Sequence, residues 1–209
     1  NVIYERTFQN RFGSSITGHL DLNNVTKIGN EAFMCCAFEG ELVIPEGVTN
    51  IPARCFSDHL IGSDFTQIIL PSTLREIGAE AFRHCKRLNK VMFNEGLISI
   101  GEHAFEYCDN LIDLELPSTL QIVQQYAFAG CSGITGITCH STEPPIILES
   151  AIDAIPKDNF VVKVPFNSIN RYATHSKWGQ FTRISAYHDF SISRRQARAL
   201  NTRTSKSYI

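Results

Sequence analysis

Phenylalanine returns at a nearly constant interval along most of the chain. Steps of 23, 26, 23 and 23 residues separate Phe33, Phe56, Phe82, Phe105 and Phe128, and Phe8 is a plausible earlier member. A period of this length is typical of repeat proteins, in which a unit cannot bury its apolar face alone and stacks on its neighbours. The spacing predicts a solenoid of about six coils, 23 residues each, with short parallel strands, turns and little helix.

A six-residue phrase, Ile-Gly-x-x-Ala-Phe, ends at three of these rings. It occupies 28–33, 77–82 and 100–105, with an echo at 123–128 and a looser copy at 51–56. Between the phrases lies an apolar block with the alternation of a short β-strand. Its inward pairs are Leu20/Leu22, Leu42/Ile44, Ile68/Leu70, Val91/Phe93, Leu114/Leu116 and Ile137/Cys139.

Proline marks a corner after three of the strands, at Pro45, Pro71 and Pro117, because it has no donor for a ladder and a fixed backbone angle. We expect the glycines at 29, 78 and 101 to permit a tight turn. Stacked coils place each apolar residue over its counterpart at about 4.8 Å, so the rings form a spine. Burial of each ring contributes roughly 1.5–3 kcal/mol.

Composition and charge exclude several classes of protein. Hydrophobic residues make up 43% and charged residues 19%, which is typical of a globular chain. No apolar run approaches the roughly eighteen residues of a spanning helix, so we expect no membrane insertion. The net charge of -2 gives no bias toward nucleic acid. Residues 1–3 contain neither an initiator Met nor a leader, as in a trimmed or processed chain.

Residues 77–93 and 100–117 resemble the BspA-type leucine-rich repeat family, whose phrase reads I-G-x-x-A-F-x-x-C-x-x-L-x-x-V-x-L-P. The resemblance covers about residues 13–140 and implies a right-handed coil, capped at both ends. It also implies a surface or secreted protein of host-associated bacteria, often adhesive. Two departures concern the middle coils: three extra residues near 59–64, and Asn94 in place of the usual proline.

The resemblance divides the chain into four segments. These are an N-terminal cap or partial repeat at 1–19, the repeats at 20–140, a C-terminal capping segment at 141–187 and a tail at 188–209. Residues 191–209 of this tail carry Arg194, Arg195, Arg198, Arg203 and Lys206 without an acid, which leaves residues 1–190 at a net charge of -7. A solvated helix or a stub is the expected role of this tail, and a basic interaction arm is the alternative.

Four cysteines, Cys36, Cys85, Cys108 and Cys131, each follow a repeat phenylalanine by three residues. A ladder points such side chains in parallel, whereas a metal needs converging ligands, so we interpret them as structural thiols and expect no metal or cofactor. A redox role for Cys35 with Cys36 is a weaker alternative. His84 beside Cys85 and His140 beside Cys139 are the residue types that a thiol hydrolase uses. Asp113 with Glu115 is a pair of acids of the kind that a glycosidase uses. Neighbours on a strand face opposite ways, so we expect no enzyme.

The outward strand positions are the candidate binding site, because the repeat leaves them free. They are Glu41, Val43, Gln67, Ile69, Lys90, Met92, Asp113 and Glu115. Val43, Ile69 and Met92 form an apolar stripe with a polar rim, as partner-binding surfaces do. The alternative is that the C-terminal segment or another chain covers the stripe. We predict recognition of an extracellular protein or glycan; the rivals are a structural spacer and, less favoured, a hydrolase.

Overall fold

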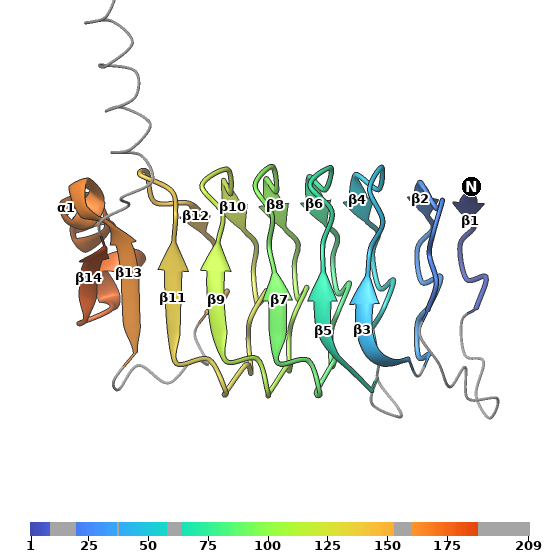
Figure 1. The fold of residues 1–209 in the computed structure, drawn as a ribbon. Helices are drawn as coiled ribbons and strands as arrows, with labels where there is room; N and C mark the ends of the chain where they lie inside the picture. Colours follow the sequence, from blue (N-terminus) through green and yellow to red (C-terminus); the bar gives the residue numbers. More distant parts are fainter. Residues whose placement is uncertain (9–19, 37, 58–63, 153–159, 188–209) are drawn as a thin grey trace, which may run out of the picture.

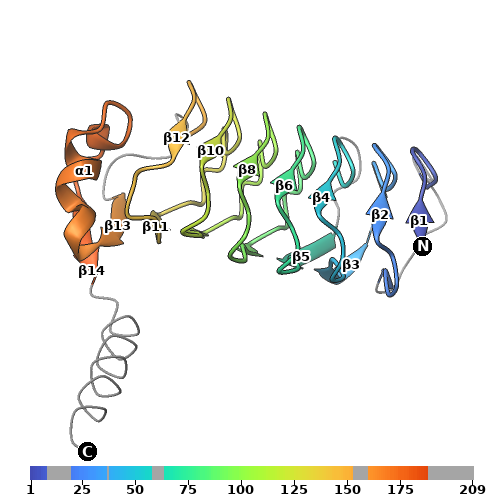
Figure 2. The same cartoon turned by 90° about the horizontal axis from the view of Figure 1, so that it is seen from above.

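The computed structural model describes residues 1–8, 20–36, 38–57, 64–152 and 160–187. In it the chain winds into a parallel β-solenoid with little helix, as the period predicted. The solenoid has about seven turns rather than the six coils expected, since strands at Val2–Ile3 and Ile146–Ile147 add to those of the repeated phrase. Figure 1 shows the coils from the side, and Figure 2 shows them from above as a row of similar loops. The basic tail at 188–209 and the extra residues at 58–63 lie outside the described residues, so their predicted roles stay predictions.

Two strand ladders run along the rod, the first before the corner of each coil and the second after it. The second ladder consists of β1 (Val2–Ile3), β2 (Lys27–Ile28), β4 (Asn50–Ile51), β6 (Glu76–Ile77), β8 (Ser99–Ile100), β10 (Ile122–Val123) and β12 (Ile146–Ile147). β1 pairs with β2. The strands β4, β6, β8, β10 and β12 form one parallel five-stranded sheet. β12 continues this sheet beyond residue 140, inside the segment that was expected to cap the rod.

The first ladder carries five of the six predicted strand blocks, whereas the block at Leu20 and Leu22 forms no strand. Its members are β3 (Glu39–Val43), β5 (Asp64–Ile69), β7 (Lys90–Met92), β9 (Asp113–Leu116), β11 (Gly136–Cys139), β13 (Val161–Pro165) and β14 (Ile184–Tyr187). All pairings are parallel. Every predicted inward residue of these blocks is buried except Leu20 and Phe93, which are half-buried.

The phenylalanines form the predicted spine. Phe8, Phe33, Phe56, Phe82, Phe105 and Phe128 stack with centroids 5.2–5.5 Å apart and interplanar angles of 3–13°. All but Phe8 are at most 2% exposed. Repetition of one ring at one place in each coil therefore builds a single core rather than several.

The repeat glycines serve close packing and not the turn that we expected. A Cβ on Gly101 would lie 2.7–2.8 Å from backbone atoms of Gly78, Ala79 and Ile77 in the preceding coil. The left-handed backbone of the turn falls two residues later, as at His103 with φ of 55°. The same angle, 55–56°, recurs at Glu31, Arg54, Glu80 and Tyr126. Glycine is needed because two backbones approach there, a contact that separate coils make only after stacking.

Replacement of Gly101 by alanine should lower the free energy of unfolding by about 1–2 kcal/mol. Overpacking against rigid backbone costs about 1–3 kcal/mol, and the lost flexibility of the unfolded chain returns about 0.4–1 kcal/mol. Urea denaturation measures the difference. Gly136→Ala is the control, since a Cβ there lies 3.0 Å from its nearest neighbour and has more room. Equal effects of the two substitutions would contradict the packing role.

The corners of neighbouring coils interlock through complementary side chains. The carboxylate of Glu46 accepts the backbone N–H and the hydroxyl of Ser72 at 2.9 and 3.0 Å, and Gly47 N–H donates to Thr73 Oγ1 at 3.0 Å. The Ser72 N–H, more than the hydroxyls, lowers the pKa of Glu46. The same contacts recur between Glu95, Gly96, Ser118 and Thr119. These hydrogen bonds therefore join the corners of successive coils at two places along the rod.

The C-terminal segment packs on the last coil. It contains η1 (Phe166–Ser168), the single α-helix α1 (Ile169–Thr174) and η2 (Trp178–Gln180) within the described residues. Trp178 and Tyr172 are fully buried; Trp178 Nε1–H donates to Pro145 O at 2.9 Å and Tyr172 O–H to Ser141 O at 3.0 Å. Across the described parts of the chain, every helix is too short or too polar to span a bilayer.

Candidate functional site

The predicted outward columns lie side by side on the first ladder. In β3, β5 and β7, Glu41 pairs with Gln67 and Gln67 with Lys90. The next outward positions pair in the same way, in the order Val43, Ile69 and Met92. These six side chains therefore form two adjacent rows across a three-stranded sheet.

The apolar row is open to solvent. Val43 is 46% and Met92 44% exposed, and Ile69 between them is half-buried. Gln67 lies beside the row and its amide approaches Met92 Sδ at 3.7 Å. The described part of the C-terminal segment packs at the far end of the rod, next to β11 and β13, and leaves this row uncovered (Figure 1). We call Val43, Ile69 and Met92 the apolar stripe.

The sequence had suggested that the outward columns continue without a break to Asp113 and Glu115. In the structure they do not. β7 is the last strand of one sheet and β9 the first strand of the next, without ladder pairing between them. Figure 1 shows a wider space there than between the other strands. Phe93, which follows β7, takes the place that Leu70 and Leu116 fill in the flanking coils. Its ring meets Phe105 edge-on at 5.8 Å and needs more room than leucine.

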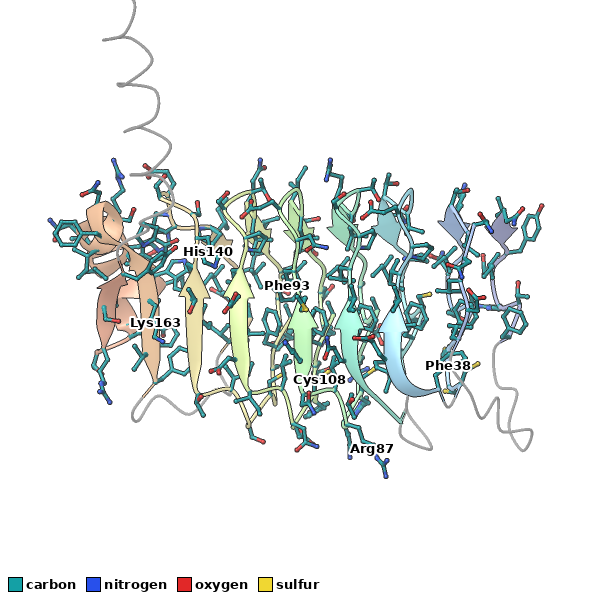
Figure 3. The ribbon with its side chains drawn as sticks, in the orientation of Figure 1. Phe38, Arg87, Phe93, Cys108, His140 and Lys163 are labelled. Atoms are coloured by element: carbon teal, nitrogen blue, oxygen red, sulfur yellow. The ribbon has the colours of Figure 1, made fainter. Side chains whose placement is uncertain are left out.

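The break leaves a hollow of about 490 Å³ on the outward face. Val91, Met92, Phe93 and Ile112 supply its apolar lining. Its polar lining comes from Asn89, Lys90, Asn94, Asp113 and Glu115. Figure 3 shows Phe93 in the region between β7 and β9. Four of the eight predicted site residues thus meet at this hollow, Lys90 and Met92 from one sheet and Asp113 and Glu115 from the other.

A second hollow, of about 480 Å³, flanks the opposite edge of the three-stranded sheet. Residues 20–23 line one side of it, with Asp21 as their charged member. Glu41, Val43 and Pro45 line the other side. The apolar stripe therefore runs from one hollow to the other. Sequence reasoning found the stripe but not the hollows, because both arise where successive coils fail to pair as strands.

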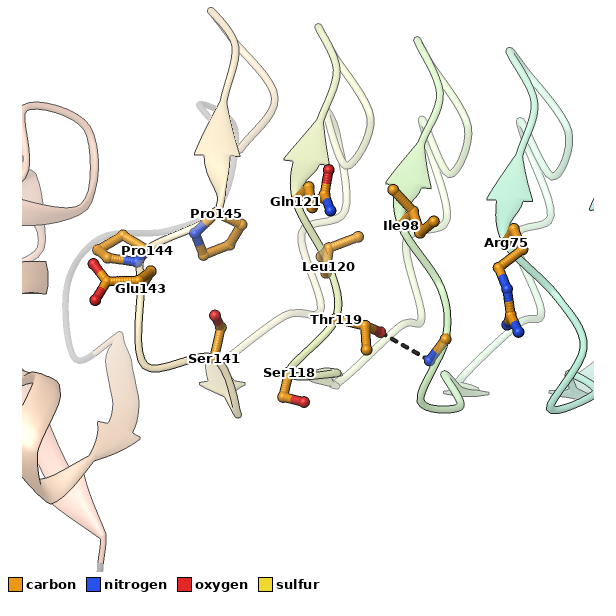
Figure 4. Close-up of a pocket in the computed structure, with 11 residues that line it drawn as sticks. Arg75, Ile98, Ser118, Thr119, Leu120, Gln121, Ser141, Glu143, Pro144 and Pro145 are labelled. Atoms are coloured by element: carbon orange, nitrogen blue, oxygen red, sulfur yellow. Dashed lines mark hydrogen bonds between the residues drawn. The ribbon is translucent and has the colours of Figure 1, made fainter.

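A third hollow, of about 610 Å³, lies along the corners on another face of the rod (Figure 4). Its lining includes Arg75, Ile98, Gln121 and Pro144. Two of its polar groups are already engaged, since Gly96 N–H donates to Thr119 Oγ1 at 2.8 Å and Arg75 donates to Ser72 O at 3.1 Å. The corner interlock uses these donors, so this hollow is a weaker candidate than the outward face.

The whole solenoid, including its N-terminal strands and most of the C-terminal segment, matches a known repeat family. Six copies of the BspA type leucine rich repeat region match residues 1–63 and 60–177. The chain belongs to the BspA-type leucine-rich repeat family. A search among curated proteins finds no match.

Two solved structures are similar to this BspA-type chain, and the first of them supports a shared fold. One is a leucine rich cell surface protein from Faecalibacterium prausnitzii, at 19% identity and a TM-score of 0.50, where the match covers 91% of this chain and 52% of that one. The other is a leucine-rich repeat protein from Bacteroides ovatus, at 18% identity and a TM-score of 0.44, covering 89% of this chain and 64% of that one. The chain thus spans about half to two thirds of these proteins, and the likeness concerns the fold alone.

The cysteines of the BspA-type phrase hold neighbouring coils together. Cys85 Sγ donates to Phe56 O at 3.4 Å, Cys108 to Phe82 O at 3.2 Å and Cys131 to Phe105 O at 3.1 Å. All seven cysteines lie in the described residues, where they are buried and form no disulfide. Burial raises the pKa of Cys108 well above its ordinary value. These contacts support the structural interpretation, since a neutral buried thiol is a poor nucleophile and a poor metal ligand.

The His–Cys and Asp–Glu pairs that the sequence offered for a thiol hydrolase or a glycosidase do not form a site in the described residues. The His84 ring stacks on Tyr107 at 4.8 Å, whereas the Cys85 thiol points to the carbonyl of Phe56. Asp113 accepts from the Thr135 hydroxyl at 3.2 Å on an open strand face. Within the described ranges, no three His, Cys, Asp or Glu side chains gather as metal ligands would. Cys85 and Asp113 are thus each engaged with a residue of a neighbouring coil.

Sequence reasoning missed a row of ion pairs along the turns of the BspA-type phrase. Arg6 lies 2.8 Å from Glu31, Arg54 lies 3.7 Å from Glu31 and 2.8 Å from Glu80. The row continues through Arg83, which is 3.2 Å from Glu80. Further contacts join Arg83 to Glu106 at 2.5 Å and Glu106 to His103 at 3.0 Å. The available signal was the alternating sign at the fourth position of the phrase: Glu31, Arg54, Glu80, His103.

The ion-pair row should make stability fall in acid. Burial alone would raise the pKa of Glu80, but hydrogen bonds and charge from Arg54 and then Arg83 outweigh burial and lower it. The unfolded chain then binds the proton more readily than the folded one, so this contribution is present above about pH 4.5 and is lost as pH falls below it. Urea midpoints should separate wild type from Glu80→Gln at pH 7 and converge near pH 3. The exposed Glu76→Gln serves as control, and an unchanged separation would refute this coupling.

Proposed function

We propose that this chain is a non-enzymatic repeat module of a cell-surface or secreted bacterial protein, and that its outward strand face binds an extracellular protein in adhesion. The single observation that carries the proposal is the apolar stripe, which lies open between two hollows on a rigid sheet. Exposed apolar surface with a polar rim is typical of partner-binding sites. A rod in which every coil holds the next in register also keeps such a surface preorganised.

A protein ligand is favoured over a glycan by the chemistry of the stripe. Val43, Ile69 and Met92 offer aliphatic side chains, whereas sugars are commonly bound on the open face of an aromatic ring. The exposed rings of Tyr107 and Tyr126 stand on the turns and stack against His84 and His103. One face of each of these two rings is therefore occupied within the rod.

An array of extracellular matrix proteins and glycans tests the proposal. Met92→Ser with Val43→Ser removes apolar surface without adding charge and should weaken binding to a protein ligand by about tenfold or more, which is at least about 1.4 kcal/mol. Ile146→Ser is the matched control, because Ile146 is 55% exposed on the second ladder. A ligand that binds the double variant as well as wild type would remove this face from consideration. If the wild type bound nothing, the alternative of a structural spacer would replace the proposal.

A further inference from the structure

The carboxylates around the apolar stripe lack the partners that other acids of this fold have. On the turns, Glu31, Glu80 and Glu106 each lie within 4.0 Å of an arginine. Around the stripe the acids are Asp21, Glu41, Asp113 and Glu115, all exposed. Within the described residues none of these four has a lysine or arginine within ion-pair distance; Glu115 has only His140, at 4.0 Å.

The four acids fall into two pairs, one at each end of the stripe. Asp21 and Glu41 line the hollow beside β3, and Asp113 and Glu115 line the hollow beyond β7. Among the described residues that line the two hollows, Lys90 is the single cation. The face thus presents an apolar centre with negative charge at both ends.

The spacing of the coils sets the length of a ligand that can meet both ends. From the coil of Asp21 to the coil of Asp113 there are four coil steps, of which only the two between β3, β5 and β7 are strand-paired at about 4.8 Å, so the four steps span at least about 20 Å. An extended peptide covers about 3.3 Å per residue. About six residues therefore separate two groups that reach the two acidic ends at once.

We propose that the face binds an extended protein segment with apolar residues at its centre and lysine or arginine at both ends, about six residues apart. This inference rests on the proposed function and specifies its ligand. The apolar residues lie over Val43, Ile69 and Met92. One basic end enters the hollow with Asp21 and Glu41, and the other enters the hollow with Asp113 and Glu115. The alkyl stem of a lysine or arginine suits the second hollow, whose floor is apolar and whose rim is charged.

Synthetic peptides provide a direct test. The probe is a fluorescent decapeptide with two lysines at each end and six alternating valines and serines between them, measured by anisotropy against the whole chain at low salt. Asp113→Asn with Glu115→Gln should weaken its binding by about three- to tenfold, as expected for exposed charge pairs. A peptide with only two residues between its lysine pairs should bind more weakly by a similar factor, and a peptide with glutamates at its ends should not bind. Rising salt should lower the affinity of the probe for the chain because the charges are exposed.

A charge-matched control separates a local site from general attraction. Glu76→Gln with Glu149→Gln removes two exposed acids elsewhere on the rod and should leave the affinity unchanged. The inference is overturned if the probe does not bind at low salt, if spacer length has no effect, or if the control variant weakens binding as much as the Asp113/Glu115 variant. If a ligand from the array depends on Met92 but not on Asp113 and Glu115, the proposed function stands and this inference fails. A neutral glycan as the ligand would overturn both this inference and the choice of a protein ligand in the proposed function.

Discussion

Replacement of Phe105 by alanine is expected to lower the free energy of unfolding by about 3–5 kcal/mol, the usual cost of removing a fully buried aromatic ring. Phe105 has no exposed surface and stacks between Phe82 at 5.2 Å and Phe128 at 5.3 Å. It also makes a T-shaped contact with Phe93. One substitution therefore removes three ring contacts and interrupts the spine in its middle. Urea denaturation followed by circular dichroism measures the loss.

Phe166→Ala is the matched control, because Phe166 is the same residue at 55% exposure. Its substitution should change the free energy of unfolding by less than about 1 kcal/mol. If Phe105→Ala were as mild as Phe166→Ala, the spine would not be the principal source of stability. If unfolding of the Phe105 variant became two separate transitions, the rod would consist of two units that meet at this ring.

The second large effect is expected at Arg83, whose removal should cost about 2–3 kcal/mol. Its guanidinium lies 3.2 Å from Glu80 and 2.5 Å from Glu106, although its Nε–H is not aligned for a hydrogen bond with Glu106. The Glu106 side chain is only 9% exposed. Arg83→Ala would leave that carboxylate desolvated with His103 as its remaining close partner. Breaking a buried pair costs about 3–5 kcal/mol, and the 28% exposure of Arg83 reduces this figure.

A rescue experiment distinguishes loss of the charge partner from loss of packing. Adding Glu106→Gln to Arg83→Ala removes the unpaired charge and should recover about half of the lost stability, on the order of 1 kcal/mol. Arg171→Ala is the control, because Arg171 and Glu143 form a pair in which both side chains are more than half exposed. The Arg171→Ala substitution should lower the free energy of unfolding by less than about 1 kcal/mol. No recovery in the double variant would assign the Arg83 effect to packing alone.

The core residues could be predicted from the sequence because the positions of apolar residues along a strand indicate which side chains are buried. Alternation within a block identifies Leu42, Ile68 and Leu114 as inward residues, and the 23-residue period places them over one another. Both rules involve only residue type and position along the chain. The same rules identified Val43, Ile69 and Met92 as an outward row, since the neighbours of inward residues on a strand must face the other way.

The candidate site was predictable only in part, because its shape depends on how well neighbouring coils pair. The sequence placed Lys90 and Asp113 in one column, but a phenylalanine at position 93 accompanies a break of the ladder between them. The break turns a flat column into a hollow with charges on both walls. Asn94, the departure from the family's proline, lies in the lining of that hollow and donates through its side-chain amide to Leu70 O.

By itself the sequence determined the coil, its period, the aromatic spine and the sidedness of each strand, because these follow from where apolar residues recur. Only the tertiary structure decided why the glycines are needed, which acids are paired and where the strand ladder opens. Those features depend on contacts between residues about 23 positions apart, at separations of a few ångströms. A repeat pattern predicts that such residues are neighbours, but not whether their backbones touch, their charges meet or their strands part.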